Sequence, residues 1–214
     1  MIQLAAFLGN PGKDYERNRH NAGRLLAGSL PFYQSLSWQK KFKGLYAGSD
    51  GKHFLMPETY MNLSGESVYS AAAFYKIKPE EIIVVHDELE LPFGTISLKF
   101  SGGLGGHNGL RSMKQCFDSA DFWRLRIGLG RPDSRLPGRG SSSSREDGEG
   151  IIDWVLSDFS KTECEKLVPI FEAGAGLLLQ TMNAEPETLL KEWAKKKILV
   201  QESAEKKEEK NDNK

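Results

Sequence analysis

Short apolar runs that end in polar or glycine-rich segments constrain the fold of this chain more than any other feature. Residues 2–8 are mostly apolar and lead into Gly-Asn-Pro-Gly. Residues 82–85 read Ile-Ile-Val-Val and lead into His-Asp-Glu-Leu, and residues 95–100 alternate apolar side chains before the glycine-rich segment 102–109. Runs with these boundaries are typical of buried strands. The polar segments therefore lie at strand ends, where an open α/β sheet forms its ligand crevice.

Segments with helical spacing separate these strands. Ser64 is a suitable N-cap for one helix, and Ser-Lys-Thr-Glu at residues 160–163 is a capping box for a long one. Pro186, at a first helical position, begins another. The sequence predicts helices over residues 21–33, 64–75, 107–117, 160–182 and 186–193.

Two more strands and a hairpin complete the predicted sheet. Residues 123–129 and 151–156 fit strands, and an Asp-Gly turn between residues 45–47 and 54–56 predicts an antiparallel hairpin. Strands that alternate with helices favour a parallel sheet with both faces covered, which the hairpin makes mixed. The predicted fold class is α/β: a single-domain, three-layer α/β/α sandwich with a mixed, mostly parallel twisted sheet.

The 214 residues are enough for one α/β domain, which we place at residues 1–197. Within it, residues 131–150 are rich in Pro, Gly, Ser and charge, and we expect a mobile loop there. Residues 198–214 are dominated by Glu, Lys and Asn, so we expect a disordered charged tail.

Composition excludes several classes of protein. No apolar run approaches the ~20 residues that cross a bilayer, and the first residues lack the basic region of a signal peptide, so we expect a cytoplasmic protein with no membrane partner. Neither Cys116 nor Cys164 belongs to a C-x-x-C pair, which removes the common zinc and redox motifs. The formal net charge is zero, so contact with RNA requires a local basic patch.

The glycine-rich segment does not match the known nucleotide-binding patterns. After Gly-Leu-Gly at residues 103–105, Asn108 replaces the third glycine of the dinucleotide fingerprint, and the chain has no P-loop. It also has no Gly-x-Ser-x-Gly elbow of the serine hydrolases. His86, Asp87 and His107 offer metal ligands without a recognised spacing, so a metal-dependent hydrolase stays open as an alternative.

A histidine that acts as general base on water fits the remaining polar residues. His20 precedes a predicted helix, and Asp87 directly follows a buried strand. A carboxylate that accepts the proton of one imidazole nitrogen leaves the other nitrogen able to deprotonate water. Such a pair accelerates hydrolysis roughly 10²–10⁴-fold, which suits an activated ester better than an amide.

Three asparagines lie near the same strand ends. Asn10, Asn62 and Asn108 each offer one acceptor and two donors without a charge. The alternative for each of them is an Asx turn, which we favour for Asn10 taken singly because it lies beside Pro-Gly. Together they suit a substrate that carries peptide-like or ester groups.

Six segments along the chain match one family of enzymes. They read Phe-Leu-Gly-Asn-Pro-Gly from residue 7, Arg-His-Asn-Ala-Gly from 19, Pro-Glu-Thr-Tyr-Met-Asn-Leu-Ser-Gly from 57, His-Asp-Glu-Leu-Glu-Leu-Pro from 86, Gly-Gly-His-Asn-Gly-Leu from 105, and Arg-Leu-Arg-Ile-Gly from 124. In this order, over about residues 1–195, the chain resembles the bacterial peptidyl-tRNA hydrolases.

The resemblance implies a monomeric cytosolic enzyme without metal or other cofactor. It would cleave the ester between tRNA and a peptide or N-blocked aminoacyl group, and so release tRNA for recycling. By motif, His20 resembles the general base, Asp87 its orienting partner, and Asn10 the residue that separates N-blocked from free aminoacyl-tRNA. Other matching positions resemble the family's contacts to the acceptor end and phosphate backbone of tRNA: Tyr15, Tyr60, Asn62 and Asn108, with Lys99 and Arg126 as a clamp on one phosphate.

A non-catalytic RNA-binding adaptor on the same fold stays open as another alternative. The Ser/Arg-rich residues 131–150 and the charged tail motivate it. The presence of His20, Asp87 and the three asparagines argues against it, because a protein that only binds RNA has no need of that set.

Overall fold

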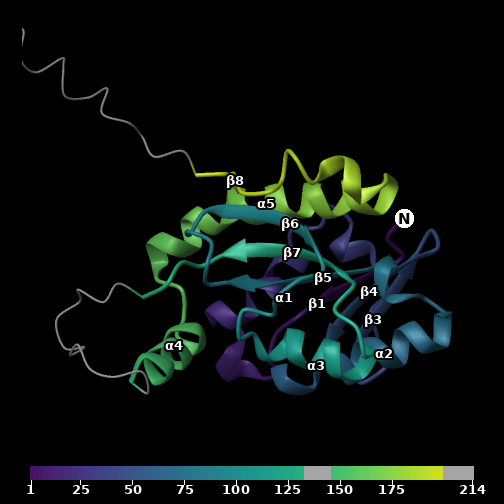
Figure 1. Cartoon of the computed structure of the whole chain (residues 1–214), viewed down its shortest axis with the longest axis horizontal. Coiled ribbons are helices and arrows are strands. Elements are labelled where there is room, and N and C mark those ends of the chain that lie inside the picture. The colour runs from purple at the N-terminus through teal and green to yellow at the C-terminus, as the bar shows by residue number, and fades with distance from the viewer. Residues whose placement is uncertain (133–145, 200–214) are drawn as a thin grey trace, which may run out of the picture.

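The chain folds into three layers around one mixed β-sheet, and the computed structural model describes residues 1–132 and 146–199. The strands are β1 (Leu4–Phe7), β2 (Gln39–Lys41), β3 (Gly44–Ser49), β4 (Lys52–Pro57), β5 (Ile82–Glu88), β6 (Thr95–Phe100), β7 (Trp123–Gly128) and β8 (Lys196–Lys197). The α-helices are α1 (Ala22–Ala27), α2 (Ser64–Tyr75), α3 (Asn108–Phe117), α4 (Glu146–Leu156) and α5 (Lys161–Asn183). Figure 1 shows α5 on one side of the sheet and α2 and α3 on the other.

The centre of the sheet is parallel and its flanks are antiparallel. The strand order is β2-β3-β4-β1-β5-β7-β6-β8. β1 pairs in parallel with β4 and β5, and β5 with β7. Antiparallel pairs join β2, β3 and β4 on one flank and β7, β6 and β8 on the other. The predicted α/β class with a mixed sheet is confirmed. The expectation that the sheet is mostly parallel is wrong, because four of the seven strand pairs among the described residues are antiparallel.

Each face of the sheet buries its own apolar cluster. Along β1, Leu4 and Ala6 contribute to the cluster under α2 and α3, whereas Ala5 and Phe7 contribute to the cluster under α1 and α5. This alternation follows from the pleat of the strand. The helices α2 and α3 approach closely at Gly65, where a Cβ would lie 2.2 Å from the Ser112 carbonyl oxygen.

The predicted strand at residues 151–156 is wrong, because these residues form the second half of α4. Ile151 and Val155 lie one helical turn apart, so this short run fits a helix as well as a strand. The expected loop 131–150 is also too long, since residues 146–150 already belong to α4. Residues 133–145 of that loop lie outside the described residues.

Other helix boundaries also shift. Ser64 is the first residue of α2 rather than its cap, and Leu63 occupies the cap position. The predicted helix 21–33 shortens to α1, and the one that begins at Pro186 is a single 3₁₀ turn, Pro186–Leu189. The capping box of α5 is confirmed, with Ser160 and Glu163 bonded reciprocally.

The predicted tail, residues 198–214, begins too early, because residues 198 and 199 are still part of the fold. The Ile198 N–H donates to the Gly94 carbonyl oxygen at 2.8 Å, and both Ile198 and Leu199 pack against the core. Residues 200–214 lie outside the described residues. Within the described ranges, every helix lacks the sustained apolar stretch that a bilayer span requires.

Candidate active site

The carboxyl ends of β1 and β5 bring several polar segments together. The Leu8 N–H donates to the Val85 carbonyl oxygen at 3.0 Å, so the segment after β1 stays beside β5. Gly23 lets the start of α1 lie against the same strand, because a Cβ there would be 2.2 Å from the Val85 oxygen. His20, in the 3₁₀ turn Arg19–Asn21 just before α1, is thereby held next to Asp87 in β5.

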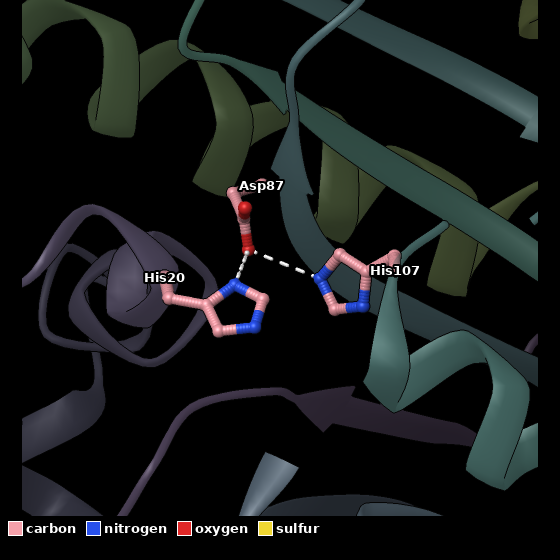
Figure 2. Close-up of side chains that lie close together, drawn as sticks. All are labelled: His20, Asp87 and His107. Atoms are coloured by element: carbon pink, nitrogen blue, oxygen red, sulfur yellow. Dashed lines mark hydrogen bonds and ion pairs between the residues drawn. The ribbon is translucent and has the colours of Figure 1, made fainter. Parts of the chain in front are cut away.

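Two imidazoles share one oxygen of Asp87, as Figure 2 shows. His20 Nδ1 lies 2.9 Å from Asp87 Oδ1, and His107 Nε2 lies 3.0 Å from the same oxygen. The Asp87 side chain is only 3% exposed, so the carboxylate is almost fully removed from water. A buried carboxylate needs such donors to remain charged.

The tautomer of His107 follows from its place at the start of α3. Its Nδ1 accepts from the backbone N–H groups of Gly109 at 3.1 Å and Leu110 at 3.4 Å, as the N-cap of that helix. An acceptor nitrogen carries no proton, so the proton of neutral His107 is on Nε2 and is donated to Asp87. His107 therefore acts as a fixed donor to the carboxylate.

The electrostatics favour a charged Asp87 and a basic His20. Burial alone would raise the pKa of the Asp87 carboxyl, but the His20 and His107 imidazoles outweigh burial and hold this pKa well below its usual range. Burial alone would lower the pKa of His20, but the charge and hydrogen bond of Asp87 outweigh it and raise this pKa above its usual value. Since His20 Nδ1 donates to Asp87, its Nε2 keeps a lone pair for a proton.

A hollow of about 200 Å³ opens beside these residues. His20, Asp87, His107 and Asn108 supply polar groups to its lining. The apolar part of the lining comes from Leu89, Leu104, Ile151, Ile152 and Val155. A small cavity with convergent polar groups and titratable residues of shifted pKa is the usual form of an active site.

A hollow of about 400 Å³ lies elsewhere, between α1 and α5, where Leu25, Phe159, Leu167 and Phe171 contribute to its lining. Among the described residues that line it there is no histidine and no pair of facing carboxylates. Since convergent polar groups indicate a site better than volume does, the smaller hollow is the candidate active site.

Asn10 is held in one orientation at the end of β1. Its Oδ1 accepts the Met61 N–H at 2.8 Å, and its own backbone is bonded to both side-chain groups of Asn21. The Met61 N–H fixes which way the Asn10 amide points. The Asn10 NH₂ group is the part of the side chain that remains to donate to a ligand.

Four predicted substrate contacts come from three segments of the chain, and only one of these residues, Asn108, lines the hollow. Tyr15 and Tyr60 pack edge to face with their ring centroids 6.5 Å apart. Asn62 follows directly after Met61 and is exposed, and exposed Asn108 lines the hollow. Tyr15, Tyr60 and Asn62 are not among the described residues that line the hollow.

Lys99 and Arg126 lie on neighbouring strands and share a face of the sheet. Lys99 is paired in register with Arg124, and Arg126 with Ser97, so the two predicted clamp residues are diagonal neighbours. Arg126 already donates to Ser97 Oγ at 2.7 Å and lies 3.6 Å from a Glu88 carboxylate oxygen. Arg126 is therefore held in place by its own side-chain contacts.

Comparison with known proteins decides the family. The sequence model of the family described as peptidyl-tRNA hydrolase matches residues 4–201. The chain belongs to the peptidyl-tRNA hydrolase family. The peptidyl-tRNA hydrolase of Treponema pallidum (strain Nichols) is 45% identical over 208 residues, which cover 92% of this chain and 97% of the relative. That of Desulfitobacterium hafniense (strain Y51) is 42% identical over 177 residues, which cover 81% and 89%.

Solved members of the peptidyl-tRNA hydrolase family share the fold. The structure of the enzyme from Acinetobacter baumannii gives a TM-score of 0.74 at 32% identity and covers 89% of this chain and 93% of that chain. A complex of peptidyl-tRNA hydrolase with N-propanol gives a TM-score of 0.76 with the same coverage and identity. The family that the six motifs predicted is therefore confirmed.

Three residues of the site were not assigned from the sequence to the roles that their contacts suggest. The sequence predicts His107 at a helix start, within a family motif and as a possible metal ligand, but not as a donor to Asp87; it gives Asn21 only as part of a motif and as the start of a helix. Arg124, which is fully buried, donates to the carbonyl oxygens of Gly103 at 2.6 Å and Gly102 at 2.9 Å. In the sequence, the alternation of β7 puts Arg124 on the same face as Arg126. This shared face is the sequence feature that could have indicated a role for Arg124 in the site.

The donor set does not suit a metal ion. The ligand atoms of His20, Asp87 and His107 lie within 4.8 Å of one another. However, the His107 Nδ1 lone pair is taken by the start of α3, so its Nε2 presents a proton rather than a lone pair. This geometry disfavours the metal-dependent alternative.

His86, the further ligand in that alternative, is also engaged. Its Nδ1 lies 2.6 Å from the Asp87 carbonyl oxygen, and its Nε2 is buried without a hydrogen bond in the described part of the chain. The pKa of His86 lies well below its usual value, mainly because the side chain is buried and further because His107 lies beside it. His86 is therefore a neutral side chain packed under the site.

Proposed function

We propose that this chain hydrolyses the ester between tRNA and a peptide or N-blocked aminoacyl group, with His20 as the general base. The observation that supports this most is the 2.9 Å contact between His20 Nδ1 and Asp87 Oδ1. It leaves Nε2 to take a proton from a water molecule as the water attacks the ester carbonyl. The proton then passes to the departing 3′ oxygen of the tRNA, so the free acid and tRNA are released.

Asp87 supports both stages of this reaction. Its charge stabilises the imidazolium that forms when His20 takes the proton, and its hydrogen bond fixes the ring in the useful tautomer. His107 keeps the carboxylate charged by donating to the same oxygen. His107 thus belongs to the proposed machinery as a positioning residue.

The orientation of Asn10 supports discrimination between N-blocked and free aminoacyl groups. Because its Oδ1 is taken by Met61, the side chain offers a donor to the substrate. A donor can pair with the carbonyl of a peptide or acyl group, but it cannot pair with the ammonium of a free amino acid. A free aminoacyl group would therefore lose hydration without gaining a partner.

The contacts to tRNA are also part of the proposal. Lys99 and Arg126 would hold a phosphate, which Arg can bind bidentately. The segments that carry Tyr15, Tyr60, Asn62 and Asn108 would contact the acceptor end. A monomeric state, a cytoplasmic location and activity without a cofactor stay predictions from the sequence.

The test is hydrolysis of N-acetyl-aminoacyl-tRNA beside its unblocked counterpart. The wild type should cleave the blocked substrate and spare the free one. His20→Ala should lose about 10²–10⁴-fold in rate and still bind tRNA. His53→Ala is the matched control, because it removes the imidazole of a histidine on β4 that bonds to Tyr46 and is not among the described residues that line the hollow. Wild-type turnover by His20→Ala would show that another group is the base.

The same assay separates the alternatives. A non-catalytic adaptor would bind tRNA and leave both esters intact. A metal-dependent hydrolase would lose its activity after exhaustive treatment with EDTA, whereas the proposed mechanism predicts full activity.

A further inference from the structure

Arg19 directly precedes His20 and is buried, but the proposed reaction does not use it. One Arg19 nitrogen, Nη1, donates to Ser157 Oγ at 2.8 Å and to the Asp158 carbonyl oxygen. The other, Nη2, donates to both carboxylate oxygens of Glu163 at 2.9 and 2.7 Å. A guanidinium with this many fixed partners holds segments together.

The same guanidinium stacks on the end of α4. Its Cζ lies 3.9 Å from the centroid of the Trp154 ring and 5.2 Å from that of Phe159. The backbone adds to the contact, since the Arg19 N–H donates to the Ser157 carbonyl oxygen at 3.1 Å. Arg19 thus ties the end of α4, the linker and the start of α5 to the turn that carries His20.

Glu163 is fixed independently of Arg19. As part of the capping box of α5, its Oε2 accepts the Ser160 N–H at 2.7 Å. Burial alone would raise the pKa of the Glu163 carboxyl, but the donors of Ser160 and Arg19 outweigh it and lower this pKa. The partner of Arg19 is therefore a charged group on a rigid helix start.

The other side of α4 forms part of the active-site hollow. Ile151, Ile152 and Val155 line it together with His20 and Asp87. Val155 is the immediate neighbour of Trp154, the residue on which Arg19 stacks. In Figure 1, α4 lies at the end of the sheet, next to the start of α5. The Arg19 side chain therefore contacts the same helix that forms this wall.

We propose that Arg19 is a positioning residue that holds α4 as the apolar wall of the crevice, and that this wall favours an apolar side chain on the amino acid joined to the tRNA. The inference rests on the proposed esterase function. Lysine cannot replace Arg19, because it lacks the planar group that stacks on Trp154 and bonds twice to Glu163. The guanidinium therefore supplies the side-chain part of the contact between the His20 turn and the end of α4, in addition to the backbone hydrogen bonds there.

The experiment compares kcat/KM for N-acetyl-leucyl-tRNA and N-acetyl-glycyl-tRNA in the wild type and in Arg19→Lys. The wild type should have the higher kcat/KM for the leucyl ester. In the variant, the ratio of kcat/KM for the leucyl ester to that for the glycyl ester should fall about tenfold, which is the size of effect that one or two methylenes have in an apolar pocket. The acid limb of the pH profile should stay in place, because the His20–Asp87 contact is unchanged. Arg24→Lys is the control, since Arg24 bonds to the Pro57 carbonyl oxygen and belongs to another contact.

Glu163→Gln tests the contact between Arg19 and Glu163 by changing its carboxylate partner. It should reduce the preference in the same direction, and the double variant should lose less than the sum of the two singles, because both act on one contact. A lowered Tm with an unchanged leucyl-to-glycyl ratio would show that Arg19 only stabilises the fold. If the wild type cleaved the leucyl and glycyl esters equally well, the proposal that α4 favours an apolar side chain would be wrong. Absence of wild-type turnover on both esters would instead reject the proposed function.

Discussion

Replacement of Asp87 by asparagine isolates the effect of one buried charge on the base. The new amide would be nearly isosteric with the carboxylate, and its oxygen could still accept from His20 or His107. The negative charge would be gone, and with it the larger of the two effects of Asp87 that oppose burial of His20; a hydrogen bond to a neutral amide opposes burial less. The pKa of His20, raised above 6.5 in the wild type, should therefore fall below 6.5 in Asp87→Asn.

The rate and the pH profile should change together. The imidazolium formed during the reaction would lose its counter-charge, so the plateau rate should fall about 10²–10⁴-fold, which is about 2.7–5.5 kcal/mol of transition-state stabilisation. Activity is lost as the pH falls through the pKa of the base. The midpoint of the acid limb should therefore lie above pH 6.5 in the wild type and below it in the variant.

The measurement is single-turnover hydrolysis of N-acetyl-aminoacyl-tRNA between pH 5 and 8. Asp50→Asn is a matched control, because it makes the same chemical change in the exposed turn between β3 and β4. A variant that is slow but keeps the wild-type midpoint would refute the reasoning, since Asp87 would then not set the basicity of His20. A variant with the wild-type rate would remove Asp87 from the mechanism.

The remaining predictions concern stability. Glu163→Gln should lower the free energy of unfolding by about 2 kcal/mol in urea titrations at pH 7, because it breaks a largely buried pair with Arg19 while the amide keeps some hydrogen bonds. This difference should shrink as the pH falls through the lowered pKa of Glu163, where the wild type protonates too. Gly65→Ala should destabilise the fold by about 1–3 kcal/mol in the same titrations, since its Cβ would lie 2.2 Å from the Ser112 oxygen. Gly176→Ala, whose new Cβ would meet no described atom within 4 Å, should instead stabilise α5 by about 0.5–1 kcal/mol.

Local signals in the sequence were enough for most of the elements. The β-branched run of β5 and the Asp-Gly turn before β4 were correctly interpreted, because periodicity and turn chemistry act between near neighbours. The capping box of Ser160 and Glu163 was found for the same reason. Residues 151–156 were assigned wrongly, because a short apolar run does not separate a strand from a helix. Packing beside the crevice decided in favour of α4.

The sequence by itself determined the kinds of groups available: a histidine, an aspartate and neutral amides at strand ends, in the motifs of one family. Only the tertiary structure decided how they meet. His20 and Asp87 are 67 positions apart, and their contact depends on Gly23 lying against β5. The contact of His107 with Asp87 and the contacts of Arg19 with α4 could not be predicted from the spacing of residues in the sequence. Such contacts form between segments that approach only when both faces of the sheet are packed.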